Sequence, residues 1–311
     1  MRSALFALLL LLPAFTARAA GRLSTADFLN TQPDARSLGM GESGQACSVG
    51  AGALTTNPAA LAGVKAHEAY FTHSIQGNGI GADHLVYAGA FGVHRFGLAY
   101  RHLGYGTLEG RDDSGALTGG FGPSDTVYAL SYGTTAGEKM RLAATIKRVE
   151  SKIVATARTT AFDIGAQYDL DDDWALGASG HNLGGGLKYE SESNPLPARA
   201  AFGGVWRPSP GWSIAADLNA PAYAPFYAAI GGEYRARLSG ENNSVAFRAG
   251  INTKTPDAGR FAGLKAGVGG RFGPIEADYA FGPGGDIADS HLFAITYRFG
   301  TPSGEKGPRE R

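Results

Sequence analysis

The segment HLFAITYRFG, residues 291–300, decides the fold. Aromatic and branched apolar side chains occupy its odd positions from Phe293 to Phe299, whereas leucine, alanine, threonine and arginine occupy the even positions. Successive side chains of a strand point to opposite faces, so this segment has one wholly apolar face and one mixed face. A segment of about ten residues with this pattern is typical of a strand in a transmembrane β-barrel.

Similar segments recur along the chain between clusters of Gly, Pro, Asn and Asp. We count fourteen, within two, with centres near Tyr70, Tyr87, Leu98, Ala129, Thr145, Ile164, Leu176, Phe202, Ile214, Ile230, Phe247, Leu264, Ala277 and Ile295. In lipid such strands must close on themselves, because unpaired backbone groups are costly there. Alternate connections are short, and the longer ones include residues 105–124 and 185–197. The sequence therefore predicts an all-β, 14-stranded antiparallel transmembrane β-barrel over residues 65–300.

Charged side chains share one face of each expected strand. A Lys or Arg that faces lipid at mid-membrane costs roughly 2 to 4 kcal/mol. In FYAAIGGEYRARL, residues 226–238, the apolar positions can face lipid only if Glu233, Arg235 and Arg237 point inward. The same reasoning predicts a polar lumen lined by Arg101, Arg141, Lys147, Asp163, Asp217, Glu233, Arg235, Arg237, Arg248, Lys265, Glu276 and Asp278.

The N-terminus predicts export. Arg2 precedes a leucine-rich apolar run, and Ala17 and Ala19 stand where a signal peptidase reads small residues. We expect residues 1–19 to be a cleaved signal peptide and residues 20–64 to form an N-terminal hatch. Residues 301–311 form a hydrophilic tail that we expect in the periplasm. The expected location is the bacterial outer membrane, in contact with its lipid.

Composition excludes some partners. Without Arg2 and Arg18 the chain has 26 basic and 28 acidic side chains, and no basic block could neutralise nucleic-acid phosphates. The single Cys47 cannot form an internal disulfide. We expect no nucleic-acid partner, and we expect Cys47 to pack as a small hydrophobic residue.

The stretch ARSLGMGESGQACSVGAGALTTNPAALAG, residues 35–63, precedes the first strand. Its small side chains suit a compact plug inside a barrel. Gly39 and Gly41 permit tight turns against the wall, and Pro58 fits the first turn of a short helix after Asn57. We expect Gly39, Gly41, Asn57, Pro58 and Ala59 to belong to an inserted hatch. The alternative is a lid of periplasmic loops.

Two parts of this stretch carry a family resemblance. Residues 35–41 (ARSLGMG) and 57–62 (NPAALA) are similar to the GARSLGMGG-like and NPAGLA-like motifs of the PorV/PorQ-like (UPF0164) branch of the FadL-type outer-membrane transport barrels. GASGHNLGGGLKY and NPLPARAAFGG, between Gly177 and Gly204, resemble mid-barrel segments of the same branch. Glu42 and Ala60 stand where the motifs have glycine.

The resemblance implies a fourteen-stranded barrel with an internal hatch. It implies that hydrophobic, fatty-acid-like small molecules cross the membrane through a non-enzymatic barrel. The alternative is a secretion or scaffold barrel that binds protein cargo or another envelope protein, as the PorV-like similarity suggests.

Sequence patterns that resemble catalytic or cofactor-binding motifs occur here without the neighbouring elements that those motifs require. Residues 39–44 match G-x-G-x-x-G, but no preceding strand and following helix surround them. Asp171, Asp172 and Asp173 fit a solvated turn better than a calcium site, and the histidines show no metal-ligand spacing. No G-x-S-x-G elbow surrounds Ser131, Ser179 or Ser213. We expect no enzyme, no cofactor and no metal.

Overall fold

The computed structural model describes residues 24–77, 79–189, 192–240, 242–255, 261–284 and 289–302. The expected signal peptide, residues 1–19, lies outside the described residues, as does most of the expected tail from residue 303 onward. Among the described residues, no helix is long and apolar enough to cross a membrane.

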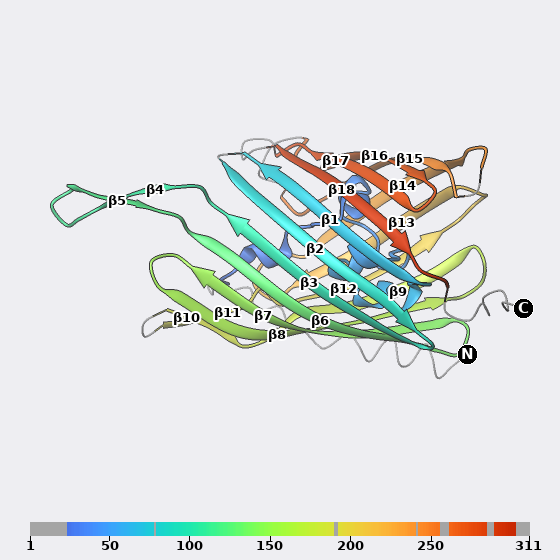
Figure 1. Cartoon of the computed structure of the whole chain (residues 1–311), viewed down its shortest axis with the longest axis horizontal. Coiled ribbons are helices and arrows are strands. Elements are labelled where there is room, and N and C mark those ends of the chain that lie inside the picture. Colours follow the sequence, from blue (N-terminus) through green and yellow to red (C-terminus); the bar gives the residue numbers. More distant parts are fainter. Residues whose placement is uncertain are drawn as a thin grey trace, which may run out of the picture.

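Fourteen antiparallel strands close into one barrel (Figure 1). They are β1 (His67–Gln76), β2 (Ile80–Phe91), β3 (His94–Gly104), β6 (Ser124–Ala136), β7 (Met140–Lys152), β8 (Thr156–Asp169), β9 (Trp174–Gly184), β12 (Arg199–Trp206), β13 (Trp212–Pro221), β14 (Tyr227–Arg237), β15 (Ser244–Asn252), β16 (Leu264–Phe272), β17 (Ile275–Gly282) and β18 (Ser290–Phe299). β1 pairs with β18 from His67↔Phe299 to Gln76↔Ser290, so the segment around residue 295 closes the wall. The expected 14-stranded antiparallel barrel is confirmed, and every expected strand centre falls within one of these strands.

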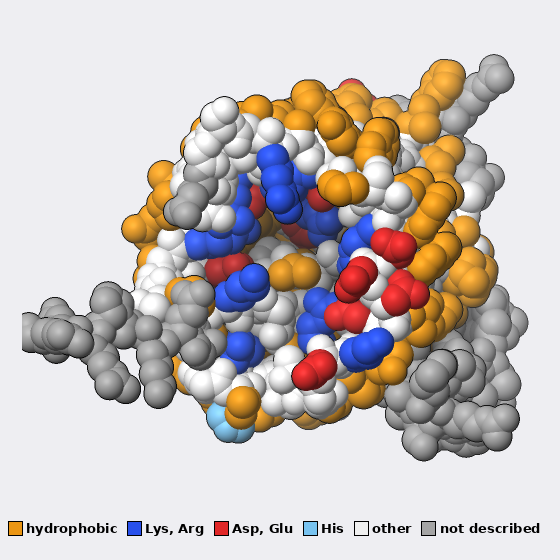
Figure 2. Space-filling view, turned by 90° about the vertical axis from the view of Figure 1, so that its right-hand side faces the viewer, with side chains coloured by type: hydrophobic (Ala, Val, Ile, Leu, Met, Phe, Trp, Pro, Cys, Tyr) orange, Lys and Arg blue, Asp and Glu red, His pale blue; other side chains and the backbone are white. Residues whose placement is uncertain are grey.

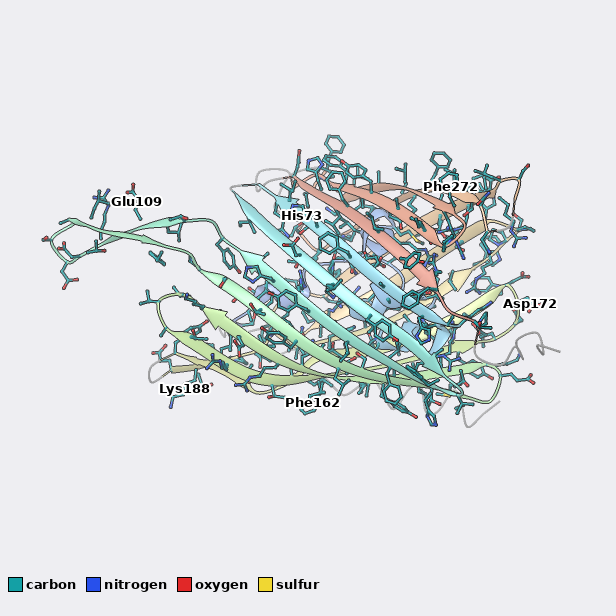
Figure 3. All side chains as sticks on the ribbon, in the orientation of Figure 1. His73, Glu109, Phe162, Asp172, Lys188 and Phe272 are labelled. Carbon is teal, nitrogen blue, oxygen red and sulfur yellow. The ribbon has the colours of Figure 1, made fainter. Side chains whose placement is uncertain are left out.

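The two barrel ends differ. At one, the short-turn end, strands are joined by tight turns such as those at Gly92 and Gly273. The other, the long-loop end, carries residues 105–123 and 185–198, and Glu109 and Lys188 mark it in Figure 3. These connections, expected as loops, contain two hairpins, β4 (Leu108–Arg111) with β5 (Leu117–Phe121) and β10 (Gly186–Tyr189) with β11 (Glu192–Pro195). The first projects far beyond the wall (Figure 1).

Alternation along the strands separates an apolar exterior from a polar interior. In β18, Phe293, Ile295 and Tyr297 are about half exposed, whereas Leu292 and Thr296 are buried. Phe162 and Phe272 point away from the barrel in Figure 3. An outward apolar band is what a bilayer requires of a barrel.

Aromatic residues gather at the short-turn end of the outer surface. Trp174 of β9 stacks on Trp206 of β12 with ring centroids 5.7 Å apart, and Trp212 lies 4.9 Å from Tyr234. Such residues form the interfacial girdles that anchor barrels at the edge of the hydrocarbon.

The N-terminal segment lies inside the barrel (Figure 1). Residues 24–64, which we call the hatch segment, contain η1 (Asp27–Asn30), α2 (Ala35–Gly39), η2 (Ala51–Thr55) and η3 (Pro58–Gly63). Leu54 and Leu61 of this segment share a buried apolar cluster with Tyr70 and Val86 of the wall. Cys47 is also buried, in a cluster with Met40 and Val205.

The apolar outer face of the strands predicts a large cost for a charged side chain placed on it. Leu130 is the central residue of β6 and is 51% exposed on the outer face. Leu130→Arg should destabilise the protein in lipid vesicles by about 2 to 4 kcal/mol, because the guanidinium would face hydrocarbon. Val93→Arg, in a turn at the short-turn end, should cost about 0 to 1 kcal/mol. Urea unfolding followed by tryptophan fluorescence measures both, and equal costs would contradict a membrane-spanning wall.

Candidate functional site: the lumen and its hatch

Asn57 joins the hatch segment to the wall. Its side-chain oxygen accepts a hydrogen bond from the Ala59 amide at 3.0 Å and so caps η3, in which Pro58 is the first residue. Its Nδ2 donates to the Gln45 carbonyl at 2.8 Å and lies 3.2 Å from the carbonyl oxygen of Ala166 in β8. Asn57 has no exposed surface. The side-chain amide of Asn57 therefore fixes both the start of η3 and the distance between η3 and the wall.

Glycines in the wall allow the hatch backbone to approach closely. A Cβ at Gly177 of β9 would lie 2.0 Å from the Gln45 oxygen, and one at Gly231 of β14 would lie 2.0 Å from the Met40 oxygen. Gly41 itself has φ +72°, and its Cβ would meet the Ile251 amide at 2.5 Å. Side chains at these positions are excluded by contact with the opposing backbone.

Wall carboxylates hold hatch amides. Asp217 Oδ2 accepts hydrogen bonds from the amides of Gly44 and Gln45, at 2.7 and 3.0 Å. Glu68 Oε2 accepts one from the Ala51 amide at 2.8 Å. The carboxylates thus satisfy backbone donors that would otherwise be buried without a partner.

Arginines and carboxylates form a continuous network along one side of the lumen. Arg36 of α2 makes two 3.0 Å contacts with the Glu233 carboxylate. Arg248 contacts Glu233 and Asp278, both at 2.6 Å. The network continues through four further pairs, which are Arg235–Glu233 at 3.4 Å, Arg235–Glu276 at 2.9 Å, Arg298–Glu276 at 2.8 Å and Arg298–Glu68 at 3.2 Å. It joins the hatch segment to five strands, namely β1, β14, β15, β17 and β18.

A second polar cluster includes Asp163, His181 and Ser179. Lys147 Nζ lies 2.7 Å from Asp163, and His181 Nδ1 lies 3.6 Å from the same carboxylate. Ser179 Oγ is 2.8 Å from His181 Nε2. The order Ser–His–Asp resembles that of a hydrolase, but the Ser179 hydroxyl donates to Gln45 Oε1 at 2.7 Å and is 2% exposed. The cluster therefore anchors the hatch segment rather than presenting a nucleophile.

Glu42 occupies a position where the resembling motif has glycine. Its φ is +67°, in the left-handed region that glycine adopts without strain. Its carboxylate forms a 2.8 Å ion pair with Lys254, which follows β15. Burial disfavours the charged form of Lys254, but Glu42 and Tyr227 together outweigh this effect and raise the pKa of Lys254. The ion pair ties the hatch segment to a loop at the long-loop end.

The other residues expected in the lumen have separate environments. Arg101 contacts Thr31 of the hatch segment, and Arg141 pairs with Asp169 at 2.8 Å. Lys265 donates to the Ala262 carbonyl at 2.7 Å, apart from the network. Arg237 is exposed at the short-turn end. Gly39 ends α2 and packs against Gly267 of β16.

Sequence reasoning omitted several partners from the expected site. Arg36, Glu68 and Arg298 belong to the arginine network, and the side chains of Gln45 and Gln167 donate to backbone carbonyls of the hatch segment. Alternation in β1 and β18 places Glu68 and Arg298 on the lumenal face, so that signal was available. Alternation in β8 likewise places Gln167 on the lumenal face with Asp163, whereas Gln45 precedes the strands, so no periodicity could have identified it.

A cavity opens at the short-turn end. It has a volume of about 1230 Å³, and Figure 2 shows basic side chains around the opening together with acidic side chains on one side of it. Its lining is Arg36, Cys47, Val49, Gly63, Lys65, Ala66, His67, Glu68, Glu233, Arg235, Arg237, Leu238, Gly240, Asn242, Asn243, Ser244, Arg271, Gly273, Pro274, Glu276, Arg298, Phe299, Gly300 and Pro302. We call it the mouth cavity. Within the described ranges, no group of three or more His, Cys, Asp or Glu side chains could hold a metal ion.

A second hollow of about 570 Å³ lies on the barrel wall across β2, β3, β6 and β7. Leu85, Leu98 and Leu130 line it and are each more than half exposed. Its outward apolar side chains belong to the lipid-facing surface described above.

Comparison with solved structures places this fold among FadL-type barrels. The toluene transporter TodX of Pseudomonas putida superimposes with a TM-score of 0.61 at 13% identity, over 85% of this chain and 97% of TodX. The monoaromatic hydrocarbon channel CymD gives 0.58 at 13% identity, over 86% and 98%. A Pseudomonas aeruginosa FadL homologue gives 0.57 at 14% identity, over 87% and 99%. No family model and no curated protein sequence matches the chain.

The wall glycines provide a test with a matched control. Gly231→Ala should push the Met40 backbone away from β14, because the new methyl group would overlap it. Overpacking of this kind costs about 1 to 3 kcal/mol. In Gly232→Ala, the next residue of the same strand, the new methyl meets nothing closer than 3.8 Å. We expect Gly231→Ala to raise the conductance of single barrels in planar bilayers several-fold and Gly232→Ala to leave it unchanged. Identical conductance in both variants would contradict a hatch held by this contact.

Proposed function

We propose that this protein is a non-enzymatic outer-membrane barrel that lets hydrophobic, fatty-acid-like small molecules cross. The short-turn end faces the periplasm, and the long-loop end faces outward. The hatch segment closes the lumen at rest. Passage occurs when the hatch shifts or when the molecule leaves sideways through the wall.

One observation carries this proposal most directly. The hatch segment is held in a closed barrel by hydrogen bonds and ion pairs, such as Asp217 to the Gly44 amide and Arg36 to Glu233, that water or a ligand can replace. A plug that served stability alone could use apolar packing throughout. The solved structures of similar fold carry titles that describe a toluene transporter and a hydrocarbon channel, which supports transport without identifying the cargo.

The PorV/PorQ-like resemblance suggested a secretion or scaffold role instead. That role stays a prediction from the motifs around residues 35–41 and 57–62, because the three solved structures cited above are a transporter, a channel and a FadL homologue. Co-purification of another envelope protein with the barrel would test it.

Uptake by proteoliposomes tests the transport proposal. We expect barrels carrying the hatch to take up a fluorescent fatty acid several-fold faster than protein-free liposomes while retaining a small hydrophilic dye. Deleting Pro58 and Ala59 shortens η3 and removes the amide that Asn57 caps, so the hatch cannot seat and the dye should leak.

The control is deletion of Asp113 and Ser114 from the tip of the β4–β5 hairpin, which removes the same number of residues far from the hatch segment. This variant should behave as the unaltered protein. Fatty-acid uptake no faster than in protein-free liposomes would overturn the proposal.

A further inference from the structure

We propose that the mouth cavity binds the charged head of an amphipathic organic anion, so that the barrel favours negatively charged cargo at its periplasmic end. This inference rests on the proposed transport function and names the charge of the cargo. It assigns a binding site to residues that the hatch network does not use.

The lining of the mouth cavity has an excess of positive charge. Six basic side chains and three carboxylates line the cavity. The carboxylates of Glu68, Glu233 and Glu276 are each engaged by an arginine within 3.2 Å. Pairing therefore consumes the negative charge of the cavity and leaves basic groups over.

The excess positive charge of the mouth cavity belongs to three basic side chains. Lys65, Arg237 and Arg271 line the cavity, and none forms an ion pair with a carboxylate in the part of the chain that the structure describes. Arg271 Nε makes only a 3.3 Å hydrogen bond to the Gly273 carbonyl. A recess with one excess sign of charge and walls of low dielectric concentrates ions of the opposite sign. Guanidinium groups also match the two oxygens of a carboxylate.

The lining of the mouth cavity also includes apolar side chains. Val49 of the hatch segment lies in the lining beside the basic groups, and Leu238 after β14 and Phe299 of β18, whose side chains belong to the outer face, form an apolar edge of the cavity. Val49 is 52% exposed, Leu238 44% and Phe299 39%. A purely polar anion would gain nothing from these side chains, whereas an anion with an apolar portion would bury surface against Val49 and against the apolar edge of the cavity. The cavity volume of about 1230 Å³ accommodates such a molecule.

Equilibrium binding to the full-length protein in detergent tests the proposal. The probes are radiolabelled decanoate and decanol, which differ in the charge of the head, with protein-free micelles subtracted. We expect decanoate to bind more tightly than decanol. The triple variant Lys65→Gln, Arg237→Gln, Arg271→Gln should weaken decanoate binding about tenfold, since each exposed ion pair contributes modestly. It should leave decanol binding unchanged.

The matched control neutralises three exposed basic residues at the long-loop end, Arg111→Gln, Lys152→Gln and Lys188→Gln. Its decanoate affinity should equal that of the unaltered protein. Equal loss in both triple variants, or no loss in the first, would overturn the proposal. Competition by inorganic phosphate as strong as that by decanoate would also overturn it, since the apolar wall would then be irrelevant.

The two proposals fail separately. If decanoate binding depends on the three basic residues but liposome uptake equals that of protein-free vesicles, the anion site stands and transport fails. If uptake of the fluorescent fatty acid persists while decanoate binding ignores the triple variant, the anion site fails alone.

Discussion

The structure depends on how buried polar groups in the lumen are satisfied. Alternation in the strands turns charged side chains inward, where an unpaired charge is costly. The hatch segment supplies many of the missing partners, because Asp217 accepts two of its amides and Glu233 receives its Arg36. The hatch backbone is in turn satisfied by the wall. Removing either part would leave the other with buried groups that lack partners, so wall and hatch stabilise each other.

Close approach of backbone to backbone makes this pairing possible. The Asp217 carboxylate reaches the Gly44 and Gln45 amides where the Gln45 carbonyl touches Gly177 of the wall. Further along the wall, Met40 lies against Gly231 of β14 and Gly250 of β15. The abundance of glycine, 47 residues in the chain, therefore reflects this docking as well as the turns. A methyl group at one of these wall positions would separate the hydrogen-bonding partners as well as crowd them.

The strands of the wall were predictable from the sequence, because the alternation of apolar and polar side chains is visible within each strand. Every second residue faces lipid, so Ile295 and Arg298 reveal their faces without knowledge of any partner. The pairing of the lumenal charges was not predictable in the same way. Arg235 of β14 reaches Glu276 of β17 past two intervening strands, and only the curvature of a closed barrel brings them to 2.9 Å. The helix α2 was also missed, because its five residues are too few to show a helical period.

The hatch was only partly predictable. Asn57 and Pro58 carry a local start signal, and the structure has a 3₁₀-helix there with the Asn57 cap. The anchoring by Gln45, Gln167 and Ser179 depends on strands more than 100 residues away, so no motif signals it. The hairpins β4–β5 and β10–β11 escaped notice because segments such as Leu108–Arg111 are four residues long and lack alternation.

Isolated charges would make the lumen a poor path for an apolar molecule, but the arginine network holds its charges in pairs. Most charges of the arginine network are neutralised in pairs, whereas Lys65, Arg237 and Arg271 of the mouth cavity form no ion pair with a carboxylate among the described residues. An anionic head that arrives there can pair with these three basic groups without displacing a glutamate. Exchange with a buried carboxylate such as Glu233 would leave that carboxylate without its arginine, which is costly. The arginines that hold Glu233 and Glu276 in the resting protein are also the groups that a carboxylate cargo would meet next.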